Sequence, residues 1–408
     1  MANLCKEIFA TIMRIAIFHL AFIYSGGGEK LVLQEAEGLS KIGHQVEIFT
    51  SVVDEDKCFP DYIKKFQIRT FLPQIRFLVE NHESTLILLS CVLSPFFAFR
   101  FRKFDVILAA NQPSLWISFW VKKLFRVPYI SYLAQPTRIL HPRNIDKKTG
   151  LKFAKKTLNS LSTRLLERFK PFIKWADQTS VHNSNQVLCN GEYVKSILEK
   201  TYKIQAVSCP AGVDSRFKIG YVGIKYKKPY LLMTNRHYGQ KRFEYGIFAL
   251  SYILHKHPEF ELLVSGEETD YTDLLKALIN QLGLMEKVKF LGYVSEKELS
   301  ALYRKASIYL YTAPEEDFGM GIIEAMAAGT PVVAWNNAGP AGIIDNGRSG
   351  LLANPFDATD YSHQVERLIA NKNLYRKISQ NAVKEVKTRF LFKKHINFLN
   401  SELTKDAT

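Results

Sequence analysis

Cysteine and acidic residues are both scarce in this chain, and each scarcity excludes a class of protein. The chain has 5 cysteines among 408 residues, and no two follow the C-x-x-C spacing of zinc and redox sites. An odd, scattered set does not make a disulfide framework, so we expect a reducing compartment. The first residues also lack the basic segment and long apolar run of a secretory signal. We therefore predict a cytoplasmic protein.

Long apolar runs are missing as well. The most apolar stretch, residues 85–99, is interrupted by Ser90, Ser94 and Pro95. It is shorter than the roughly 20 residues that span a bilayer. We predict a buried helix here, with an element lying on a membrane surface as the alternative.

The shortage of acidic residues leaves a large positive charge. Lys and Arg number 55 against 39 Asp and Glu, which gives a net charge of +16. The hydrophobic share of 47% and the charged share of 23% are typical of a globular protein, and the length predicts two domains. The charge indicates a polyanion, an anionic membrane face or a phosphate-bearing substrate as partner. No nucleic-acid-binding motif accompanies it, so we do not expect nucleic acid.

Two groups of basic residues lie in the first half of the chain. One group comprises Arg100, Arg102, Lys103, Lys122, Lys123 and Arg126. A second group comprises Lys152, Lys155, Lys156, Arg164, Arg168, Lys170 and Lys174. Leu and Phe residues are interleaved with the second group, and Glu167 is its one opposing charge, so the pattern predicts an amphipathic basic helix. Its basic side is interpreted either as a peripheral attachment to an anionic membrane face or as a solvated helix face.

Strand and helix patterns alternate along most of the chain. Residues 15–20 predict a strand that leads into Gly26, Gly27 and Gly28, followed by a helix and a strand at 46–50. Such a βαβ unit implies a parallel sheet, and the alternation returns from residue 230 to residue 335. We predict an α/β fold of two tandem Rossmann-like, doubly wound parallel-sheet domains, with a ligand cleft between them at the carboxyl ends of the strands.

The expected domains are residues 1–214, residues 215–385, and a C-terminal helix at 386–408 that packs back on the first domain. Residues 358–399 read as one helical stretch with an interruption.

Two glutamates flank a predicted strand-to-helix junction. Glu316 follows a strand, and Glu324 lies in the next helix, which Gly329 and Pro331 end. Ionised carboxylates accept strong hydrogen bonds from adjacent sugar hydroxyls. We interpret Glu315 and Asp317 differently, as acidic residues that only favour the helix N-terminus electrostatically.

The residues from Glu316 to Ala334, EDFGMGIIEAMAAGTPVVA, closely resemble the E-x7-E motif of retaining glycosyltransferases of the glycosyltransferase-B architecture, family 4. The resemblance implies that Glu316 contacts hydroxyls of the donor sugar and that Glu324 holds the ribose. Phe318 and Gly319, inside the motif, are expected to contact the substrate too. The resemblance spans most of the chain and is strong from about residue 230 to residue 355.

The same family has an Arg-x4-Lys pair that holds the donor diphosphate, and Arg236 and Lys241 match its spacing. Two fixed cations stabilise the charge that develops on a departing nucleoside diphosphate. A Gly-Gly loop of the family faces the diphosphate from the first domain, which makes Gly27 and Gly28 candidates. Glycines that open a helix allow backbone N–H groups to approach phosphate.

Two segments depart from the family pattern. The loop 336–342 keeps Gly339 and Pro340 but has Gly342 in place of the usual Glu. Ala134 stands where relatives often have His, and the following Gln135 hydrogen-bonds a sugar but does not shuttle protons. Arg138, nearby, is a candidate contact for the acceptor or for phosphate.

Asp54, Glu55 and Asp56 form a D-x-D triplet, which we interpret as a polar loop; we expect no metal and no cofactor. Residues 49–59 resemble a loop of eukaryotic mannosyltransferases that act on lipid-linked oligosaccharides, which favours GDP-mannose as donor. The resemblance thus implies transfer of a hexose to a saccharide or lipid-linked acceptor with retention of configuration. The alternatives are a UDP-glucose or UDP-galactose donor, or a non-catalytic sugar-nucleotide-binding partner, which Ala134 motivates.

Overall fold

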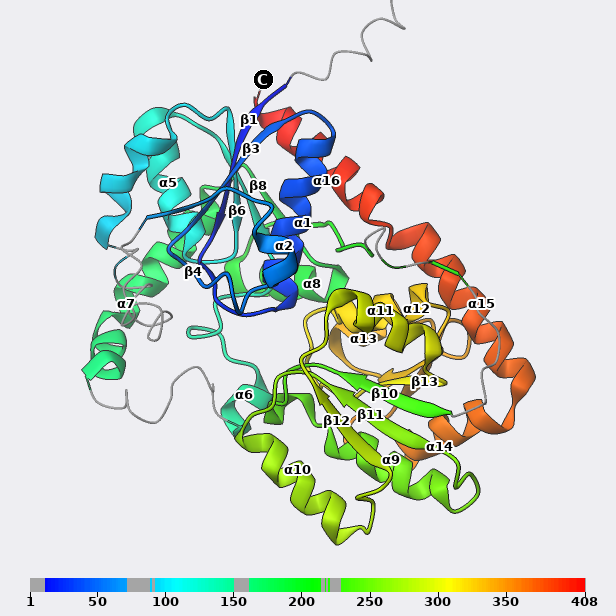
Figure 1. Ribbon diagram of the computed structural model, residues 1–408. Helices are drawn as coiled ribbons and strands as arrows, with labels where there is room; N and C mark the ends of the chain where they lie inside the picture. Colours follow the sequence, from blue (N-terminus) through cyan, green and yellow to red (C-terminus); the bar gives the residue numbers. More distant parts are fainter. Residues whose placement is uncertain are drawn as a thin grey trace, which may run out of the picture. The chain divides into compact units, whose positions relative to one another are not determined.

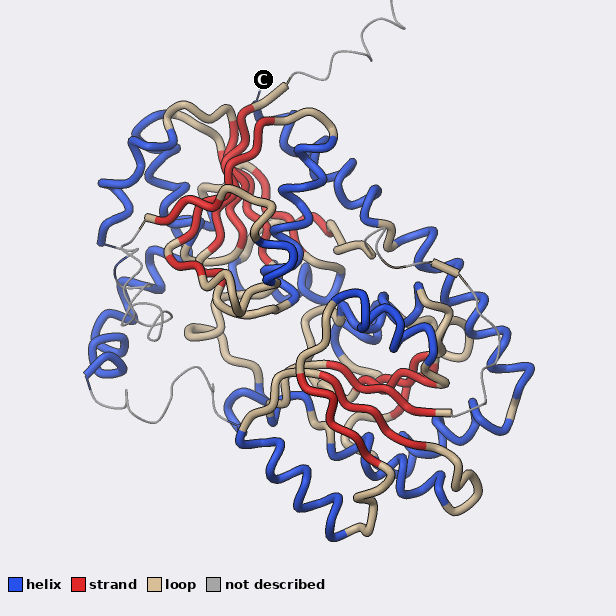
Figure 2. The backbone as a smooth tube through the Cα atoms, viewed as in Figure 1, coloured by secondary structure: helices blue, strands red, loops and turns tan. Residues whose placement is uncertain are grey.

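The computed structural model describes residues 12–71, 89, 92–149, 161–213, 217, 219–220 and 229–407. The chain forms two compact units. The first comprises Met1–Pro142, Leu151–Cys209 and His395–Thr408; the second comprises Arg143–Gly150 and Pro210–Lys394. In each unit the strands form one layer with helices on both of its faces (Figure 2).

The first unit is built on a seven-stranded parallel sheet in the order β5-β3-β1-β6-β7-β8-β9 (Figure 1). Its strands are β1 (Arg14–His19), β3 (Gln45–Thr50), β5 (Ile68–Thr70), β6 (Val106–Ala110), β7 (Tyr129–Leu133), β8 (Gln186–Cys189) and β9 (Val207–Ser208). A separate pair joins β2 (Ala21–Phe22) to β4 (Val52–Val53). The helices are α1 (Gly27–Lys41), α2 (Pro60–Ile63), η1 (Ala98–Phe101), α5 (Ser114–Phe125), α7 (Leu161–His182), α8 (Glu192–Tyr202) and α16 (Phe392–Ala407).

The second unit is built on a six-stranded parallel sheet in the order β12-β11-β10-β13-β14-β15. These strands are β10 (Tyr230–Thr234), β11 (Glu261–Ser265), β12 (Val288–Gly292), β13 (Ile308–Tyr311), β14 (Val332–Trp335) and β15 (Leu351–Ala353). The helices are α6 (Asn144–Thr149), η3 (Gly239–Lys241), α9 (Glu244–Leu254), α10 (Asp270–Gln281), α11 (Glu296–Lys305), α12 (Met320–Ala327), α13 (Ala338–Ile343), α14 (Ala358–Ala370) and α15 (Lys372–Arg389).

Local chemistry accounts for these elements. The central strands β6, β7, β13 and β14 are buried along their whole length, as expected where helices cover both faces of a parallel sheet. Helices α10 and α11 begin with capping boxes at Thr269 and Ser295, which satisfy the backbone N–H groups of the first turn. The sequence predicted this α/β, doubly wound architecture, and the structure confirms it.

Strand order places a switch point in the second sheet. The chain leaves β10 toward β11 on one side and reaches β13 on the other side, so β10 and β13 are neighbours whose crossovers run in opposite directions. In doubly wound sheets ligands bind outside the carboxyl ends of such a strand pair. The residues that follow Thr234 and Tyr311 therefore lie where a ligand is expected.

One segment departs from the division expected from the sequence, because Arg143–Gly150 belongs to the second unit. His395–Thr408, from the C-terminal stretch expected to pack back on the first domain, belongs to the first unit. The helical stretch expected at 358–399, with an interruption, is formed by α14, α15 and the beginning of α16. Asn371 separates α14 from α15, because its side chain accepts from the Leu374 N–H and starts a new helix.

Most of the apolar stretch at 85–99 lies outside the described residues; of the remainder, 89 and 92–97 are helical and 98–99 begin η1. Among the described residues, no helix combines the length and the apolar character needed to cross a membrane.

Candidate active site

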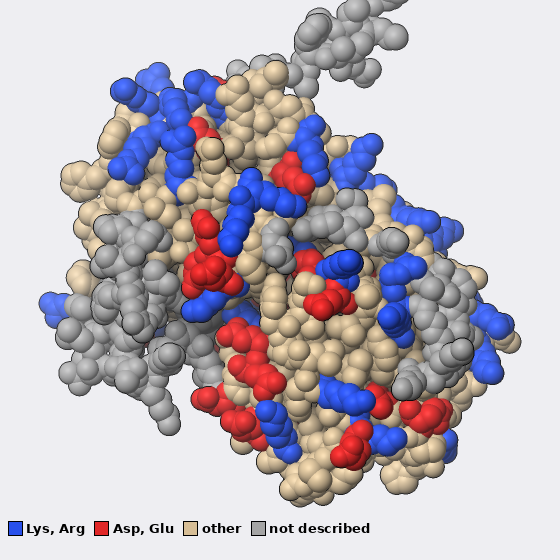
Figure 3. All heavy atoms as spheres, viewed as in Figure 1, with Lys and Arg blue, Asp and Glu red and all other residues tan. Residues whose placement is uncertain are grey.

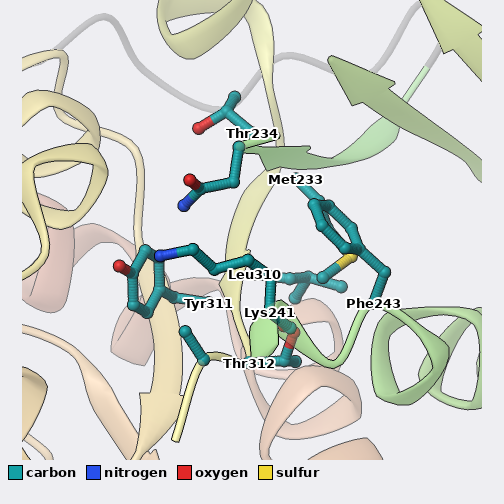
Figure 4. Close-up of a pocket in the computed structure, with 9 residues that line it drawn as sticks. Met233, Thr234, Lys241, Phe243, Leu310, Tyr311 and Thr312 are labelled. Carbon is teal, nitrogen blue, oxygen red and sulfur yellow. The ribbon is translucent and has the colours of Figure 1, made fainter. Parts of the chain in front are cut away.

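A pocket opens at the switch point of the second sheet. It is lined by Met233, Thr234, Asn235, Lys241, Phe243, Leu310, Tyr311, Thr312 and Ala313. These residues come from the ends of β10 and β13 and the residues just after them, and from η3 and Phe243, which lies two residues beyond η3. The Lys241 side chain extends across the pocket (Figure 4). Its position agrees with the general rule for doubly wound sheets.

Lys241 and Glu316 meet beside this pocket. The Lys241 Nζ lies 2.5 Å from Glu316 Oε2, and both side chains are about four-fifths buried (21% and 18% exposed). The Thr312 hydroxyl donates to the Lys241 carbonyl at 2.8 Å and so ties η3 to the residue after β13. A cation and a carboxylate are thus fixed side by side at the edge of the pocket.

The electrostatic surroundings keep Glu316 ionised. Burial by itself would raise the pKa of this carboxyl, but Lys241 and Arg143, together with hydrogen bonds from Lys241 and Tyr311, lower it below its usual value. An opposite charge nearby favours the charged form. Glu316 therefore accepts hydrogen bonds at neutral pH and has no proton to donate.

The loop that carries Glu316 is held from behind by the loop after β14. The Gly339 N–H donates to the Glu316 carbonyl at 2.8 Å. A Cβ on Gly339 would lie 2.5 Å from the Phe318 carbonyl oxygen, a backbone atom, so this contact requires glycine. Gly319, with φ +112°, begins α12 in the left-handed region that glycine tolerates.

The structure places the other predicted residues Glu324, Phe318 and Arg236 as follows. Glu324 in α12 is 5% exposed and lies near Tyr303 and Tyr309. The pKa values of these two tyrosines are raised, mainly by burial and also by neighbouring groups that include Glu324. The Phe318 ring is buried and packs against Phe390 at 6.0 Å between centroids, so Phe318 offers a ligand its backbone only. The Arg236 guanidinium lies over the Tyr238 ring at 5.0 Å.

A cluster of hydroxyl groups includes Thr234, one of the residues that line the pocket. Thr234 Oγ1 lies 3.0 Å from the Tyr303 hydroxyl and 2.8 Å from the Tyr309 hydroxyl. A Cβ on Gly321 would lie 2.3 Å from the Tyr309 hydroxyl, so α12 approaches the sheet closely only because residue 321 has no side chain. The cluster links the strand before Arg236 to the helix that carries Glu324.

Comparison with known families shows to which family the chain belongs. The family profile described as Glycosyl transferases group 1 matches residues 215–385, and the profile described as Glycosyltransferase Family 4 matches residues 25–217. The chain belongs to the glycosyltransferases of family 4, group 1. It is a glycosyltransferase, and the predicted family membership is confirmed.

Relatives and solved structures agree with this assignment. An uncharacterized glycosyltransferase of Methanocaldococcus jannaschii is 26% identical over 373 residues, which cover 87% of this chain and 88% of the relative. An alpha-1,3/1,6-mannosyltransferase of Dictyostelium discoideum is 23% identical over 444 residues, covering 96% and 98%. The structure of Anabaena HepE in complex with UDP-glucose has a TM-score of 0.74 at 18% identity and covers 96% of this chain and 100% of that one, which shows the glycosyltransferase-B fold.

The glycine loop of the first unit is crowded at one position only among those described. Gly27 and Gly28 open α1, but a Cβ on Gly28 would meet nothing within 4 Å. The crowded position is Gly26, whose Cβ would lie 2.3 Å from Glu29 Oε2. The Glu29 carboxylate, with His19 Nε2 at 3.4 Å, lies beside the start of this helix. The role of Gly27 and Gly28 stays a prediction.

The segment after β7 brings two predicted residues together. The Arg138 Nε donates to Gln135 Oε1 at 3.2 Å, and the Ala134 N–H donates to Asn111 Oδ1 at 2.9 Å. The Thr137 hydroxyl donates to Asp177 of α7 at 2.6 Å and anchors the segment. Gln135 and Arg138 are therefore presented jointly by a fixed loop of the first unit.

Asp54 has a local structural contact. Its Oδ1 accepts from the backbone N–H groups of Asp56 and Lys57, both at 3.2 Å. This is an Asx turn, which agrees with the interpretation of the triplet as a polar loop.

The basic surface is partly described. Lys152, Lys155 and Lys156 lie outside the described residues, as does the side chain of Arg164. Lys and Arg side chains gather over the part of the first unit around α5 (Figure 3). On α7, Phe169, Phe172 and Trp175 are exposed by 43%, 38% and 52%. Trp175 packs edge-on against Trp116 of α5 at 5.3 Å.

Sequence reasoning missed several residues around Glu316 and misjudged two. Tyr311 and Arg143 contact or influence Glu316 directly, and no motif marks them. Glu315 and Asp317, predicted only to favour the helix N-terminus, lie outside the first turn of α12, which contains no acidic residue. Instead, Glu315 accepts from the Ile145 N–H at 3.1 Å, and Asp317 Oδ2 lies 3.9 Å from Arg143.

Proposed function

We propose that this glycosyltransferase transfers a hexose, mannose from GDP-mannose in the first place, to a saccharide or lipid-linked acceptor with retention of anomeric configuration. The observation that carries the proposal is the Lys241–Glu316 pair at the switch point, 2.5 Å apart beside the pocket. Glu316 would bind hydroxyls of the donor sugar, and Lys241 with Arg236 would bind the diphosphate. Glu324 would hold the ribose, and Gly27 and Gly28 would face the diphosphate.

The pKa of Glu316 supports this division of roles. A carboxylate that Lys241 and Arg143 keep ionised despite its burial accepts hydrogen bonds from hydroxyls but does not protonate a leaving group. The leaving diphosphate needs fixed positive charge, which Lys241 supplies. In the proposed step, the bond from the anomeric carbon to the phosphate oxygen breaks, the acceptor oxygen bonds to the same face, and the acceptor proton passes to the leaving phosphate oxygen. Ala134 is compatible with this step, because no protein base is needed.

The proposed identity of the donor is based on similarity to known proteins. The full-length likeness to the Dictyostelium mannosyltransferase favours GDP-mannose. A second candidate is UDP-glucose or UDP-galactose, which the likeness to HepE, solved in complex with UDP-glucose, favours.

Donor turnover tests the proposal. We would incubate the protein with GDP-mannose, UDP-glucose and UDP-galactose, follow nucleoside diphosphate release, and read the anomer of the product by NMR. We expect release from GDP-mannose and a retained anomer. Preference for a UDP-sugar would overturn the donor, and an inverted product would overturn retention. Binding of every donor without turnover would show a non-catalytic binding partner instead.

We further propose that α7 and α5 attach the first unit peripherally to an anionic membrane face. Exposed aromatic side chains beside cations suit the interface of a bilayer, where Trp and Phe insert and Lys and Arg bind headgroups. On α7, Phe172 and Trp175 lie close in sequence to Lys170 and Lys174, and on α5 the Lys123 Nζ lies over the Trp120 ring at 5.0 Å. Each cation near an anionic surface contributes about 1 kcal/mol.

Co-sedimentation with vesicles tests this attachment. We expect binding to vesicles that contain anionic lipid, weak binding to neutral vesicles, and loss of binding in Trp175→Ser. Leu274→Ser is the matched control, because Leu274 is 66% exposed on α10 of the other unit. Equal binding to both kinds of vesicle, or equal effects of the two substitutions, would refute the attachment.

A further inference from the structure

A short segment between β7 and α7 belongs to the second unit although both of its neighbours in the chain belong to the first. Arg143–Gly150 is part of the compact second unit, and α6 within it lies against η3, which ends at Lys241. We call residues 143–146, the part with described contacts, the strap. The family profile that matches the donor unit begins only at residue 215, so nothing in the donor half of the sequence points to the strap.

Arg143 is fixed at one end of the strap. Its Nε and NH2 groups donate to the two carboxylate oxygens of Asp146, each at 2.9 Å. The Asp146 side chain is 1% exposed and that of Arg143 is 19% exposed. Although burial lowers the pKa of Arg143, Asp146 and the acidic residues 316 and 317 raise it above its usual value. A bidentate pair of this kind fixes the plane of the guanidinium.

The strap contacts Glu315 and Asp317, the residues on both sides of Glu316. The remaining Arg143 donor group, NH1, donates to the Glu315 carbonyl at 3.2 Å and lies 3.9 Å from Asp317 Oδ2. The Ile145 N–H donates to Glu315 Oε2 at 3.1 Å. Glu315 itself has φ +51°, a left-handed conformation that non-glycine residues hold only when their surroundings enforce it. Two hydrogen bonds from the strap supply that enforcement.

The charges around Glu316 come from several elements. Lys241 approaches from η3, Arg143 from the strap, Tyr311 from the end of β13, and Asp317 from the same loop as Glu316. Lys241 and Arg143 are the two cations that favour the ionised carboxylate, and Arg143 does so without a direct bond to it. Removing Arg143 would leave the negative charge of Asp317 less balanced beside Glu316.

We propose that Arg143 is a positioning residue of the donor-sugar site, which acts through Glu315 and Asp317 to hold the loop of Glu316 in place. The inference rests on the proposed role of Glu316 as the sugar-binding carboxylate. It implies that the donor unit is incomplete without four residues that the chain supplies from between β7 and α7. The loss of Arg143 would therefore change both the rate and its pH dependence.

The test compares Arg143→Gln and Arg143→Lys with Arg348→Gln in the full chain. Arg348 is the matched control, because it pairs with Asp345 three residues away in the same unit but is 61% exposed. We expect Arg143→Gln to lower kcat with GDP-mannose by about 10- to 100-fold, since small displacements of a positioned group cost that much. The acidic limb of the rate profile should also move to higher pH, because Glu316 loses one of its two cations.

Arg143→Lys separates charge from geometry. It keeps a cation but lacks the fork that binds Asp146 and the Glu315 carbonyl together. We expect its acidic limb to stay near that of the wild type while kcat remains reduced. If Arg143→Gln does not fold, the reduced kcat of Arg143→Lys carries the test. Unchanged kcat and an unchanged acidic limb in the folded variants would overturn the proposal.

A readout without turnover distinguishes this inference from the proposed function. The Glu316 carboxyl can be titrated by 13C NMR and assigned by its absence in Glu316→Gln. We expect its midpoint to rise in Arg143→Gln and to stay unchanged in Arg348→Gln. Absence of turnover in the wild type would refute the proposed function, whereas an unmoved Glu316 midpoint would refute the role of Arg143.

Discussion

Lys241 and Glu316 are 75 residues apart in the chain, yet the Lys241 Nζ lies 2.5 Å from Glu316 Oε2. Each follows one of the two neighbouring strands at the switch point of the second sheet, β10 and β13. The pair joins the two halves of the motif pattern, the cation that suits a diphosphate and the carboxylate that suits a sugar. Because the two charges are paired, the effect of replacing one residue should depend on whether the other is present.

Lys241→Ala and Glu316→Gln should therefore be strongly coupled. We expect each to lower kcat by about 100- to 1000-fold, the usual cost of removing a group that stabilises transition-state charge. The double variant should lose much less than the product of the two effects, because residues in contact are not additive. Steady-state kinetics checks this in a double-mutant cycle. Lys276→Ala, which removes an exposed pair with Glu268 in the same unit, is the control and should leave kcat unchanged.

Gly339→Ala should impair the site, whereas Gly342→Ala should not. A Cβ at residue 339 would meet the Phe318 backbone at 2.5 Å and push the loop of Glu316, while a Cβ at residue 342 meets nothing within 4 Å. Both glycines lie in α13. We expect kcat to fall at least about 10-fold in Gly339→Ala and stability to rise slightly, by about 0.4–1 kcal/mol, in Gly342→Ala. Similar kcat values for the two variants would contradict the role assigned to the close contact.

His395→Ala should destabilise the first unit by about 3–5 kcal/mol, because it leaves the buried Glu35 carboxylate without its cation. His395 Nε2 lies 3.0 Å from Glu35 Oε1, and neither side chain is exposed. Urea unfolding measures the loss. His255→Ala, at an exposed position, is the control and should change stability by less than about 0.5 kcal/mol.

The same pair predicts a pH dependence. Burial alone would lower the pKa of His395, but Cys209 and Glu35 raise it from 6.5 to about 10. A raised pKa in the folded state contributes stability that is fully present below pH 6.5 and is lost as the pH rises toward about 10. The stability difference between wild type and His395→Ala should therefore shrink across that window. A constant difference would show that His395 is not charged in the folded protein.

Asp177→Asn should stabilise the protein at pH 8 and have little effect at pH 4. Burial raises the pKa of Asp177 to about 6, although hydrogen bonds from Thr137, Tyr202 and Gln112 oppose the shift. Stability from this carboxyl is thus present at low pH and is lost as the pH rises through about 6. The neutral amide keeps an acceptor for Thr137 and avoids the buried charge. We expect a gain of at most about 3 kcal/mol at pH 8, measured by thermal unfolding at the two pH values.

Much of the fold could be predicted because strands and helices have local patterns of apolar residues in the sequence. The apolar β-branched runs at β1, β6 and β13, separated by helical periods, predicted parallel sheets and two doubly wound units, and the structure confirms this architecture. Some segment boundaries were predicted less accurately. The cap that Asn371 provides to α15 and the assignment of Arg143–Gly150 to the second unit depend on caps and packing partners that periodicity does not reveal.

The candidate site divides in the same way. The spacing of Glu316, Glu324, Arg236 and Lys241 identified the family and named the residues, because a motif of fixed positions is a local property of the chain. The pairing of Lys241 with Glu316 became definite only in the structure, where the order β10-β13 brings two strand ends together.

Only the tertiary structure decided which residues support the motif. Arg143 lies 173 positions before Glu316, and its neighbours in the chain belong to the other unit. Gly26 rather than Gly28 is the crowded glycine of its loop, and Glu315 and Asp317 bind the strap rather than the helix end. The sequence by itself determined the fold class, the family and the charged residues of the candidate site. Their partners were decided by packing, because contacts between segments far apart in the chain leave no periodic or local pattern.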